Sequence, residues 1–349
     1  MVVLGADLHK RTHTVVAVDE HGRRLAERTV TATREGHLEL RRWAAQWPER
    51  RWALEDGRHL SRRLEADLLR AGEHVVRVPP KLMAGTRRSA REPGKSDPID
   101  ALSVARAALR EPDLPTATLD GVEREVRLLV DRREDLVGER TREVQRLRWF
   151  LVELEVPEPA PAALDRVVVQ TRLAAELASR PELVARLARE ILARVVELSH
   201  TIRRFEREIE ARIRPLAPHL LALVGCGPLT AAKLVGETAS VSRFRSKEAF
   251  ARHNGTAPVP VWSGNTVRHR LSRGGNRQLN VAIHRIAITQ VRLGGLAKGY
   301  VDHRRAAGDT KTEALRALRR RLSDEVFRRL RLDEEAHVKV AATLTTAAA

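Results

Sequence analysis

The chain has 349 residues, enough for two or three domains, and its 64 Lys and Arg residues against 46 Asp and Glu residues give a formal charge of +18. This excess of positive charge indicates a polyanionic partner, with nucleic acid favoured over an anionic membrane. No apolar run approaches the roughly 20 residues of a membrane span, and the first residues have the pattern of a strand, not of a signal peptide. The single cysteine, Cys226, excludes an internal disulfide framework and a cysteine-cluster zinc site. We therefore expect a cytoplasmic protein that binds nucleic acid and has no membrane partner.

Aromatic residues are scarce, with one Tyr, five Phe and five Trp in the whole chain. Stacking platforms for single-stranded bases are therefore not expected as the main binding mode. Contacts between basic side chains and phosphates should dominate instead, and they predict an affinity that falls steeply with salt.

The first part of the chain alternates strand patterns with helix patterns. Apolar runs and turn residues predict strands over residues 2–7, 12–18, 24–31, 52–55 and 74–78. Helical apolar spacing predicts helices over residues 35–47 and 61–71. A basic loop is expected next, with Arg87, Arg88, Arg91 and Lys95. This order predicts a mixed sheet with helices packed on it, which is an α/β layer architecture.

A helix is predicted to begin at the sequence Ser96-Asp97-Pro98-Ile99-Asp100. Ser96 or Asp97 suits the N-cap, and Pro98 suits the first turn. Asp97 and Asp100 share one face of that helix, so both carboxylates would point at a common spot. Like charges held together need a proton or a cation between them, and Mg²⁺ is the usual hard cation. The alternative is an ordinary helix start, because acids are favoured in first turns.

Two further acids end predicted strands. Asp7 ends the first strand and Glu55 ends the fourth. Functional groups of open α/β sheets gather outside the carboxyl ends of the strands, so we expect both acids beside Asp97 and Asp100 in a four-carboxylate metal site. Asp56 is the alternative to Glu55 as second ligand, and each acid alone would also fit a capping or surface role.

The order of these acids resembles the DEDD domain of RuvC-like enzymes, which have an RNase H fold. The sequences Gly5-Ala-Asp-Leu-His-Lys and Lys95-Ser-Asp-Pro-Ile-Asp-Ala are similar, more narrowly, to DEDD transposases of bacterial insertion sequences, which add a C-terminal serine-bearing domain. The resemblance implies an RNase H-like N-terminal domain in a chain of class α/β plus α. It also implies a catalytic set that holds Mg²⁺, as two ions, against a phosphodiester: Asp7, Glu55, Asp97 and Asp100.

Two long helical patterns fill the middle of the chain, separated by Pro157, Pro159 and Pro161. The first pattern consists of Val126, Leu129, Leu136, Leu147, Leu151 and Leu154. The second consists of Leu183, Leu187, Ile191, Val195, Leu198, Ile202, Phe205, Ile209 and Ile213. Their near-heptad spacing predicts either an antiparallel hairpin within the chain or a dimerising coiled coil. The resemblance favours assembly of protomers, as a dimer or tetramer.

A Gly-x-Gly turn between apolar helices, at Gly225 and Gly227, resembles the helix-hairpin-helix DNA-binding motif. Glycines let the backbone approach a phosphate, and the start of the next helix, with Thr230 and Lys233, presents N–H groups to it. An ordinary tight helical turn is the alternative. A basic helix over residues 312–330 is a second candidate for phosphate contact, or a solvated face.

A loop rich in Pro and Gly, residues 255–265, precedes a basic segment. The basic side chains expected to clamp a phosphate are Arg268, Arg270, Arg273 and Arg277. His269 is the one local candidate for a general base. The segment is similar to the serine domain of the same transposases, which implies Ser263 as a nucleophile that forms a covalent phosphoserine, with Ser272 as the alternative. Trp262 and Asn280 depart from the family pattern, which often has a small residue and an Arg at these places.

These features predict four regions. They are a RuvC-like DEDD domain over residues 1–112, a helical coiled-coil region over 113–215, a serine-bearing domain with the helix-hairpin-helix-like motif over 216–335, and a flexible tail over 336–349. We expect a transposase or site-specific recombinase of an insertion sequence, which cuts and rejoins double-stranded DNA at the element ends and the target by Mg²⁺-assisted attack of a serine. The resemblance also implies a structured guide RNA and a place at the bacterial nucleoid. The alternatives are a metal-dependent Holliday-junction or structure-selective endonuclease, and a non-catalytic DNA-binding protein.

Overall fold

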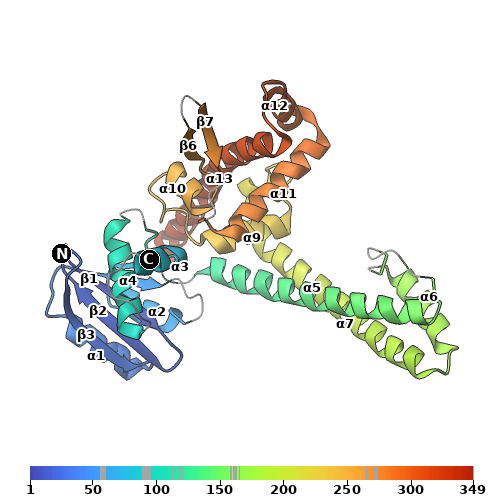
Figure 1. Cartoon of the computed structure of the whole chain (residues 1–349), viewed down its shortest axis with the longest axis horizontal. Helices are drawn as coiled ribbons and strands as arrows, with labels where there is room; N and C mark the ends of the chain where they lie inside the picture. Colours follow the sequence, from blue (N-terminus) through green and yellow to red (C-terminus); the bar gives the residue numbers. More distant parts are fainter. Residues whose placement is uncertain are drawn as a thin grey trace. The chain divides into compact units, whose positions relative to one another are not determined.

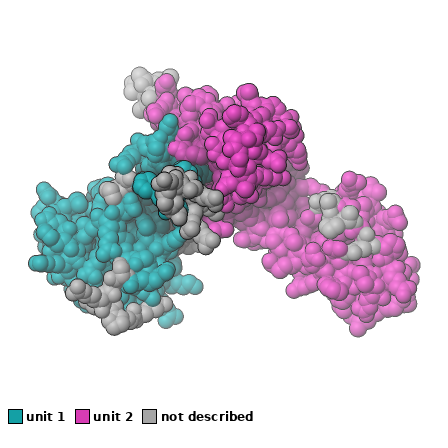
Figure 2. Space-filling model, turned by 45° about the horizontal axis from the view of Figure 1, so that its top comes forward, with its two compact units in different colours: residues 1–121, 240–276 teal, residues 122–239, 277–349 magenta. Residues whose placement is uncertain are grey.

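The computed structural model describes residues 1–55, 60–88, 96–111, 114–117, 119, 121–157, 159, 163–164, 166–263, 266–270 and 274–348. The chain forms two compact units, one of residues 1–121 and 240–276 and the other of residues 122–239 and 277–349 (Figure 2). Residues 240–276, which contain the predicted serine loop, thus group with the N-terminal residues. The domain boundaries predicted from the sequence stay a prediction.

The first unit is built on a five-stranded mixed sheet (Figure 1). Its strands are β1 (Val2–Leu8), β2 (Thr12–Val18), β3 (Arg24–Thr31), β4 (Arg50–Glu55) and β5 (Val75–Val78), in the order β3-β2-β1-β4-β5. The pairs β1–β2 and β2–β3 are antiparallel, whereas β1–β4 and β4–β5 are parallel. All five predicted strands form, and the mixed sheet with a mostly helical remainder of the chain agrees with the predicted class, α/β plus α.

Helices cover both faces of this sheet. One face packs on α1 (Arg34–Ala44) and α2 (Arg62–Arg70), through Leu4, Ala6, Trp52 and Leu54. The other face packs on α4 (Asp97–Arg110), through Val3 and Ala53. Successive strand residues point to opposite faces, so the odd-numbered residues of β1 and β4 face α4.

Gly5 brings β1 and α4 unusually close together. A Cβ atom at Gly5 would lie 2.3 Å from the carbonyl oxygen of Ala101 and 2.4 Å from the amide nitrogen of Ala105. Such distances are far shorter than van der Waals contact, so only a residue without a side chain allows this approach. The close packing sets the N-terminus of α4 beside the end of β1.

A helix stands where a loop was expected. Residues Pro80–Arg88 form α3, and Leu82 and Met83 pack partly buried against the core beneath α4. The prediction of a basic loop was wrong for Arg87 and Arg88, because it rested on their charges alone. Pro80 suits the first turn of a helix, and the apolar pair Leu82 and Met83 attaches that helix to the core. Arg91 and Lys95 lie outside the described residues.

The second unit contains a long helical hairpin (Figure 1). Helices α5 (Val122–Glu153) and α7 (Leu183–Leu216) run antiparallel along each other, with α6 (Val167–Ala178) at one end. Leu136 packs with Leu198 and Ile202, and Arg133 pairs with Glu206 at 2.5 Å. The pairing within one chain confirms the hairpin alternative predicted from the sequence.

Further helices and one more strand pair complete both units. The second unit adds α8 (Pro218–Leu221), α9 (Pro228–Thr238), α11 (Arg277–Leu293), α12 (Gly295–Ala306) and α13 (Lys311–Ala348), so the helical backbone continues into the predicted tail. The first unit adds α10 (Lys247–His253) and a hairpin of β6 (Val259–Ser263) and β7 (Thr266–Arg270). None of the helices in the described ranges combines the length and apolar character needed to cross a bilayer.

Candidate metal centre

Two of the predicted acids end neighbouring parallel strands of the sheet. Ala6 pairs with Leu54, and the next residue on each strand is Asp7 and Glu55, respectively. Asp7 lies two residues after Gly5 and Glu55 two residues after Ala53, so both are directed to the face that α4 covers. Asp7 is buried, with 6% of its surface exposed, whereas Glu55 is partly exposed.

The other two predicted acids lie in the first turn of α4. Ser96 is the N-cap residue, with extended backbone angles, and Pro98 occupies the start of the helix, as predicted. Asp97 is about half exposed, whereas Asp100, one turn further along, is 8% exposed. Their helical spacing therefore gives one carboxylate at the surface and one inside.

His9 joins Asp7 to Asp97. Its Nε2 atom lies 3.1 Å from Oδ2 of Asp7 and 3.3 Å from Oδ1 of Asp97. One donor atom from each of the three residues falls within 4.8 Å of the other two. His9 is not among the site residues predicted from the sequence. Its position two residues after Asp7, at the end of the same strand, is the signal that would have found it.

Electrostatic repulsion accompanies this geometry. Burial raises the pKa of Asp7, the charges of Asp100 and Asp97 raise it further, and His9 acts in the opposite direction. Three carboxylates, with Asp7 and Asp100 buried and Asp97 half exposed, thus lie near one another together with the half-exposed imidazole of His9. A carboxylate and imidazole donor set of this kind fits a divalent cation, which would relieve the repulsion.

Asp100 has a cationic partner of its own. Nη1 of Arg87, on α3, donates a hydrogen bond to Oδ1 of Asp100 at 2.9 Å. The structure therefore brings Asp7, His9 and Asp97 together. Asp100 is paired with the guanidinium of Arg87, and Glu55 ends the neighbouring strand β4. Asp56, the alternative to Glu55, lies outside the described residues.

The predicted serine lies on the β6–β7 hairpin. Ser263 is the last residue of β6 and pairs with Thr266 of β7, and its side chain lies outside the described part of the structure. Arg268 and Arg270 are on β7, opposite Val261 and Val259, and their side chains also lie outside it. Exposed Arg277 begins α11, and Trp262, before the serine, is 76% exposed. Ser272 and Arg273 are not among the described residues.

The predicted helix-hairpin-helix-like motif forms a tight turn between α8 and α9. Gly225 has a φ of 83°, and a Cβ there would lie 3.1 Å from the carbonyl oxygen of Ile286, so this glycine is required by packing on α11. Gly227 is the N-cap residue of α9 and is exposed, and Thr230 in its first turn is partly buried. The motif therefore keeps an open helix N-terminus at Gly227.

Lys233 does not lie at the surface of this motif. It is 5% exposed, and its Nζ atom lies 2.7 Å from Oε2 of Glu134 and 3.7 Å from Oδ1 of Asp131, both on α5. A buried ammonium is stable only with such partners. The expectation that Lys233 contacts DNA phosphates was therefore wrong.

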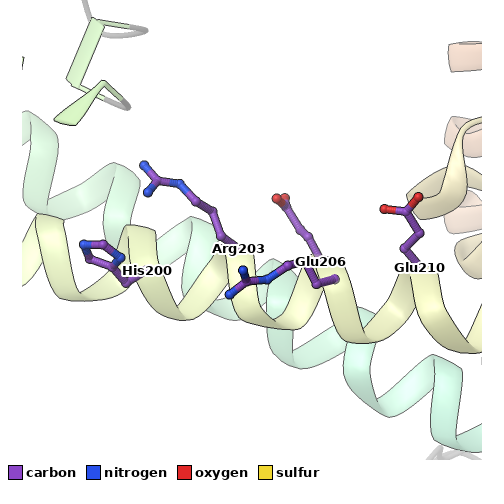
Figure 3. Close-up of a pocket in the computed structure, with 5 residues that line it drawn as sticks. His200, Arg203, Glu206 and Glu210 are labelled. Atoms are coloured by element: carbon purple, nitrogen blue, oxygen red, sulfur yellow. The ribbon is translucent and has the colours of Figure 1, made fainter. Parts of the chain in front are cut away.

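A cavity of about 410 Å³ lies elsewhere, along α7 (Figure 3). It is lined by His200, Arg203, Glu206, Arg207 and Glu210, which come from successive turns of that one helix. Glu206 is paired with Arg133 of α5. This cavity contains none of the predicted catalytic residues.

Comparison with known proteins identifies the family. A model of DEDD transposases of IS110 elements matches residues 4–155, and a model described as transposase IS116/IS110/IS902 family matches residues 217–302. The chain belongs to this transposase family. All four predicted acids lie in the first match, and Ser263 lies in the second.

Two relatives of this transposase extend over nearly its whole length. The insertion element IS116 uncharacterized 44.8 kDa protein of Streptomyces clavuligerus is 28% identical, with 94% of both chains covered. The insertion element IS900 uncharacterized 42 kDa protein of Mycobacterium paratuberculosis is 26% identical, with 94% of this chain and 95% of the relative covered. A structure of Thermus thermophilus RuvC matches 34% of this chain and 100% of its own, with 16% identity and a TM-score of 0.27.

Membership confirms several expectations. Transposases of this family are enzymes that catalyse DNA cleavage and strand transfer, so the non-catalytic alternative is wrong. Nucleases with DEDD sites use divalent metals, typically Mg²⁺, and the cluster of Asp7, His9 and Asp97 suits such an ion. DNA is the expected partner of a transposase of this family.

Proposed function

We propose that this transposase cuts and rejoins the DNA of its insertion element at a centre formed by Asp7, Glu55, Asp97 and Asp100. The single observation that carries the proposal is the cluster of Asp7, His9 and Asp97 within 4.8 Å, at the sheet edge where β1 meets α4. Mg²⁺ bound there, as two ions, would stabilise the charge that develops on a phosphate during cleavage. The carboxylates fix its position, because Asp7 is held rigidly by the sheet and Asp97 by the first helical turn.

Ser263 is the proposed nucleophile. Its Oγ atom would form a bond to phosphorus while the bond from phosphorus to the departing deoxyribose oxygen breaks. The serine proton would pass to a base, and the departing oxygen would take up a proton from an acid or from water and leave as a hydroxyl. Attack by the hydroxyl of another DNA end would reverse the step and rejoin the strands without ATP. The place of residues 240–276 in the same compact unit as the acids supports this role.

Basic residues and exposed backbone amides would hold the DNA. The proposed phosphate contacts are the turn at Gly225, Gly227 and Thr230 and the arginines Arg268, Arg270, Arg273 and Arg277. The charge of +18 supports binding of double-stranded DNA and of a structured guide RNA. A homo-oligomer, dimer or tetramer, would bring two element ends together.

Covalent trapping tests the mechanism directly. The wild-type transposase is incubated with element-end DNA, the element's own transcripts and Mg²⁺, and then denatured. We expect a protein–DNA adduct that Ser263→Ala abolishes, that Asp97→Asn abolishes, and that the control Ser242→Ala retains. Ser242 is an exposed serine of the same unit.

The outcomes separate the candidates. Free DNA ends without an adduct, together with an active Ser263→Ala variant, would show a metal-dependent endonuclease instead. An adduct lost in Ser272→Ala and kept in Ser263→Ala would move the nucleophile to Ser272. Loss of dependence on the transcripts would remove the guide RNA from the proposal.

A further inference from the structure

His9 occupies a fixed place in the turn between β1 and β2. It is the first residue after β1, and its amide donates to the carbonyl oxygen of Thr12 at 3.0 Å. This bond anchors the backbone of His9 to the start of the next strand. From this backbone position the imidazole reaches Asp7, two residues earlier, and Asp97, at the start of α4.

The distances around Nε2 match those between ligands of one metal ion. Two ligands at right angles on an ion with bonds of about 2.1 Å lie about 3.0 Å apart. Nε2 of His9 lies 3.1 Å from the carboxylate of Asp7 and 3.3 Å from that of Asp97. One nitrogen faces both oxygens, so all three atoms can bind the same ion after small adjustments.

We propose that His9 is a metal ligand of this centre, and that it makes the site bind Mn²⁺ more tightly than Mg²⁺. A neutral imidazole nitrogen is a good ligand for first-row transition metals, whereas Mg²⁺ prefers oxygen ligands and water. The oxygens of Asp7 and Asp97 serve both ions, and His9 adds affinity for Mn²⁺ alone. The proposal rests on the metal-dependent function proposed for the four acids.

An opposite role for His9 uses the same distances. With a proton on Nε2, the imidazole would hydrogen-bond to the two carboxylates and act as a clamp that an incoming metal ion must displace. The two roles predict opposite effects of removing the imidazole. Loss of a ligand weakens metal binding, whereas loss of a clamp strengthens it.

Metal titration of the full chain, without DNA, separates these roles. Calorimetry would give Kd values for Mn²⁺ and Mg²⁺, and pulsed electron paramagnetic resonance of bound Mn²⁺ would detect a coordinated nitrogen. For His9→Gln we expect a Kd for Mn²⁺ about tenfold higher or more, which corresponds to about 1.4 kcal/mol or more. The nitrogen signal should be lost, and the Kd for Mg²⁺ should change by less than about threefold.

Three variants make the test decisive. His21→Gln, at an exposed histidine near the β2–β3 turn, should leave both Kd values and the nitrogen signal unchanged. His9→Asp should restore binding through a carboxylate, without the nitrogen signal and with the preference shifted to Mg²⁺. The thermal midpoint of His9→Gln without metal, compared with wild type, shows whether the variant is folded.

The experiment distinguishes a wrong ligand role for His9 from a wrong metal centre. Unchanged or tighter Mn²⁺ binding in His9→Gln, or a wild-type complex without a nitrogen signal, would overturn the role of His9 as a ligand. Asp97→Asn should lose both ions in either case. If Asp97→Asn bound metal as wild type does, the proposed centre itself would be wrong.

Discussion

The guanidinium of Arg87 donates to the carboxylate of Asp100 at 2.9 Å, so one of the four proposed catalytic acids is already neutralised from within the chain. Arg87 lies on α3 and Asp100 on α4, and the side chain of Arg87 is about one-third exposed. A metal ion that uses Asp100 must share this carboxylate with the guanidinium or replace it. The affinity of the centre for metal therefore depends on Arg87.

Removing Arg87 should strengthen metal binding. Arg87→Ala deletes a positive charge beside Asp100, so the carboxylates attract a divalent cation more strongly, and we expect a Kd for Mg²⁺ about three- to tenfold lower. Calorimetric titration of the DNA-free chain measures this change. Arg88→Ala, at the adjacent exposed residue, is the matched control and should change the Kd little. Weaker binding in Arg87→Ala would mean that the guanidinium orients Asp100 for the metal.

Asp7→Asn should stabilise the metal-free fold while abolishing DNA cleavage. Burial, together with Asp100 and Asp97, raises the pKa of Asp7, so its ionised form costs folding free energy at neutral pH. That cost disappears as the pH falls, because the carboxyl group becomes protonated. We expect a thermal midpoint a few degrees above wild type in EDTA at pH 7.5, with a difference that shrinks at acidic pH.

Added Mg²⁺ should reduce or reverse the difference in thermal midpoint between Asp7→Asn and wild type. Wild type gains stability from bound metal, and Asp7→Asn does not, so the two melting curves should approach or cross as Mg²⁺ is added. Differential scanning calorimetry with and without the ion gives both values. A variant that melts below wild type in EDTA would show that the hydrogen bond between Asp7 and His9 outweighs the repulsion.

Gly5→Ala should loosen the contact that positions the centre. The added methyl group would overlap the backbone of α4 at Ala101 and Ala105, and overpacking of this kind costs about 1–3 kcal/mol. Chemical denaturation should show that loss, and metal affinity should fall because α4 moves away from β1. Gly85→Ala is the control, since Gly85 on α3 has open space around it and should be neutral or stabilising by up to about 1 kcal/mol. Equal stability of Gly5→Ala and wild type would contradict the close packing.

Burial of His13 should make the free energy of unfolding depend on pH. It lies on β2, its ring stacks on that of His37 with centroids 5.3 Å apart, and burial together with His37 lowers the pKa of His13 to about 4. Its protonation is favoured only in the unfolded chain, so stability is complete above about pH 6.5 and falls as the pH drops toward 4. The contribution is about 3 kcal/mol.

The slope of stability against pH is the measurement for His13. Between pH 4 and 6.5, His13→Gln should reduce that slope by about one proton, which is about 1.4 kcal/mol per pH unit. His21→Gln, at an exposed histidine, should leave it unchanged. Some slope remains in either variant, since burial and Arg243 also lower the pKa of His253 to about 3. An unchanged slope in His13→Gln would contradict the assignment.

Local patterns predicted most of the N-terminal fold. Alternating apolar residues and turn residues are set by neighbours in the sequence, so all five strands of the sheet and the helix start at Asp97 follow from them. The long hairpin was predicted less accurately. Leu183 begins the predicted seam of α7 but is 61% exposed, whereas Ala185 and Ala188 are buried. A reading based on large apolar residues overlooks alanines, which pack where two helices approach closely.

Contacts between distant residues were not predictable in this way. Lys233 is a basic residue in a motif suited to DNA, and only the fold shows that Glu134, 99 residues away, pairs with it. Nothing in the sequence near His9 indicates a partner on another element, and only the fold shows that Asp97 lies beside its ring. Arg87 likewise belonged to a predicted loop until α3 set it against Asp100. Each of these residues takes its role from a partner on another element.

Mg²⁺-dependent cleavage of element-end DNA by Asp97→Asn tests the central claim most directly. If the acids at the meeting point of β1 and α4 form the catalytic metal centre, this variant should fold and bind DNA as wild type does, yet cleave at least about 1,000-fold more slowly. Asp302→Asn, at an exposed acid of α12 paired with Lys298, should keep full activity. Cleavage by Asp97→Asn at the wild-type rate would contradict the metal centre described here.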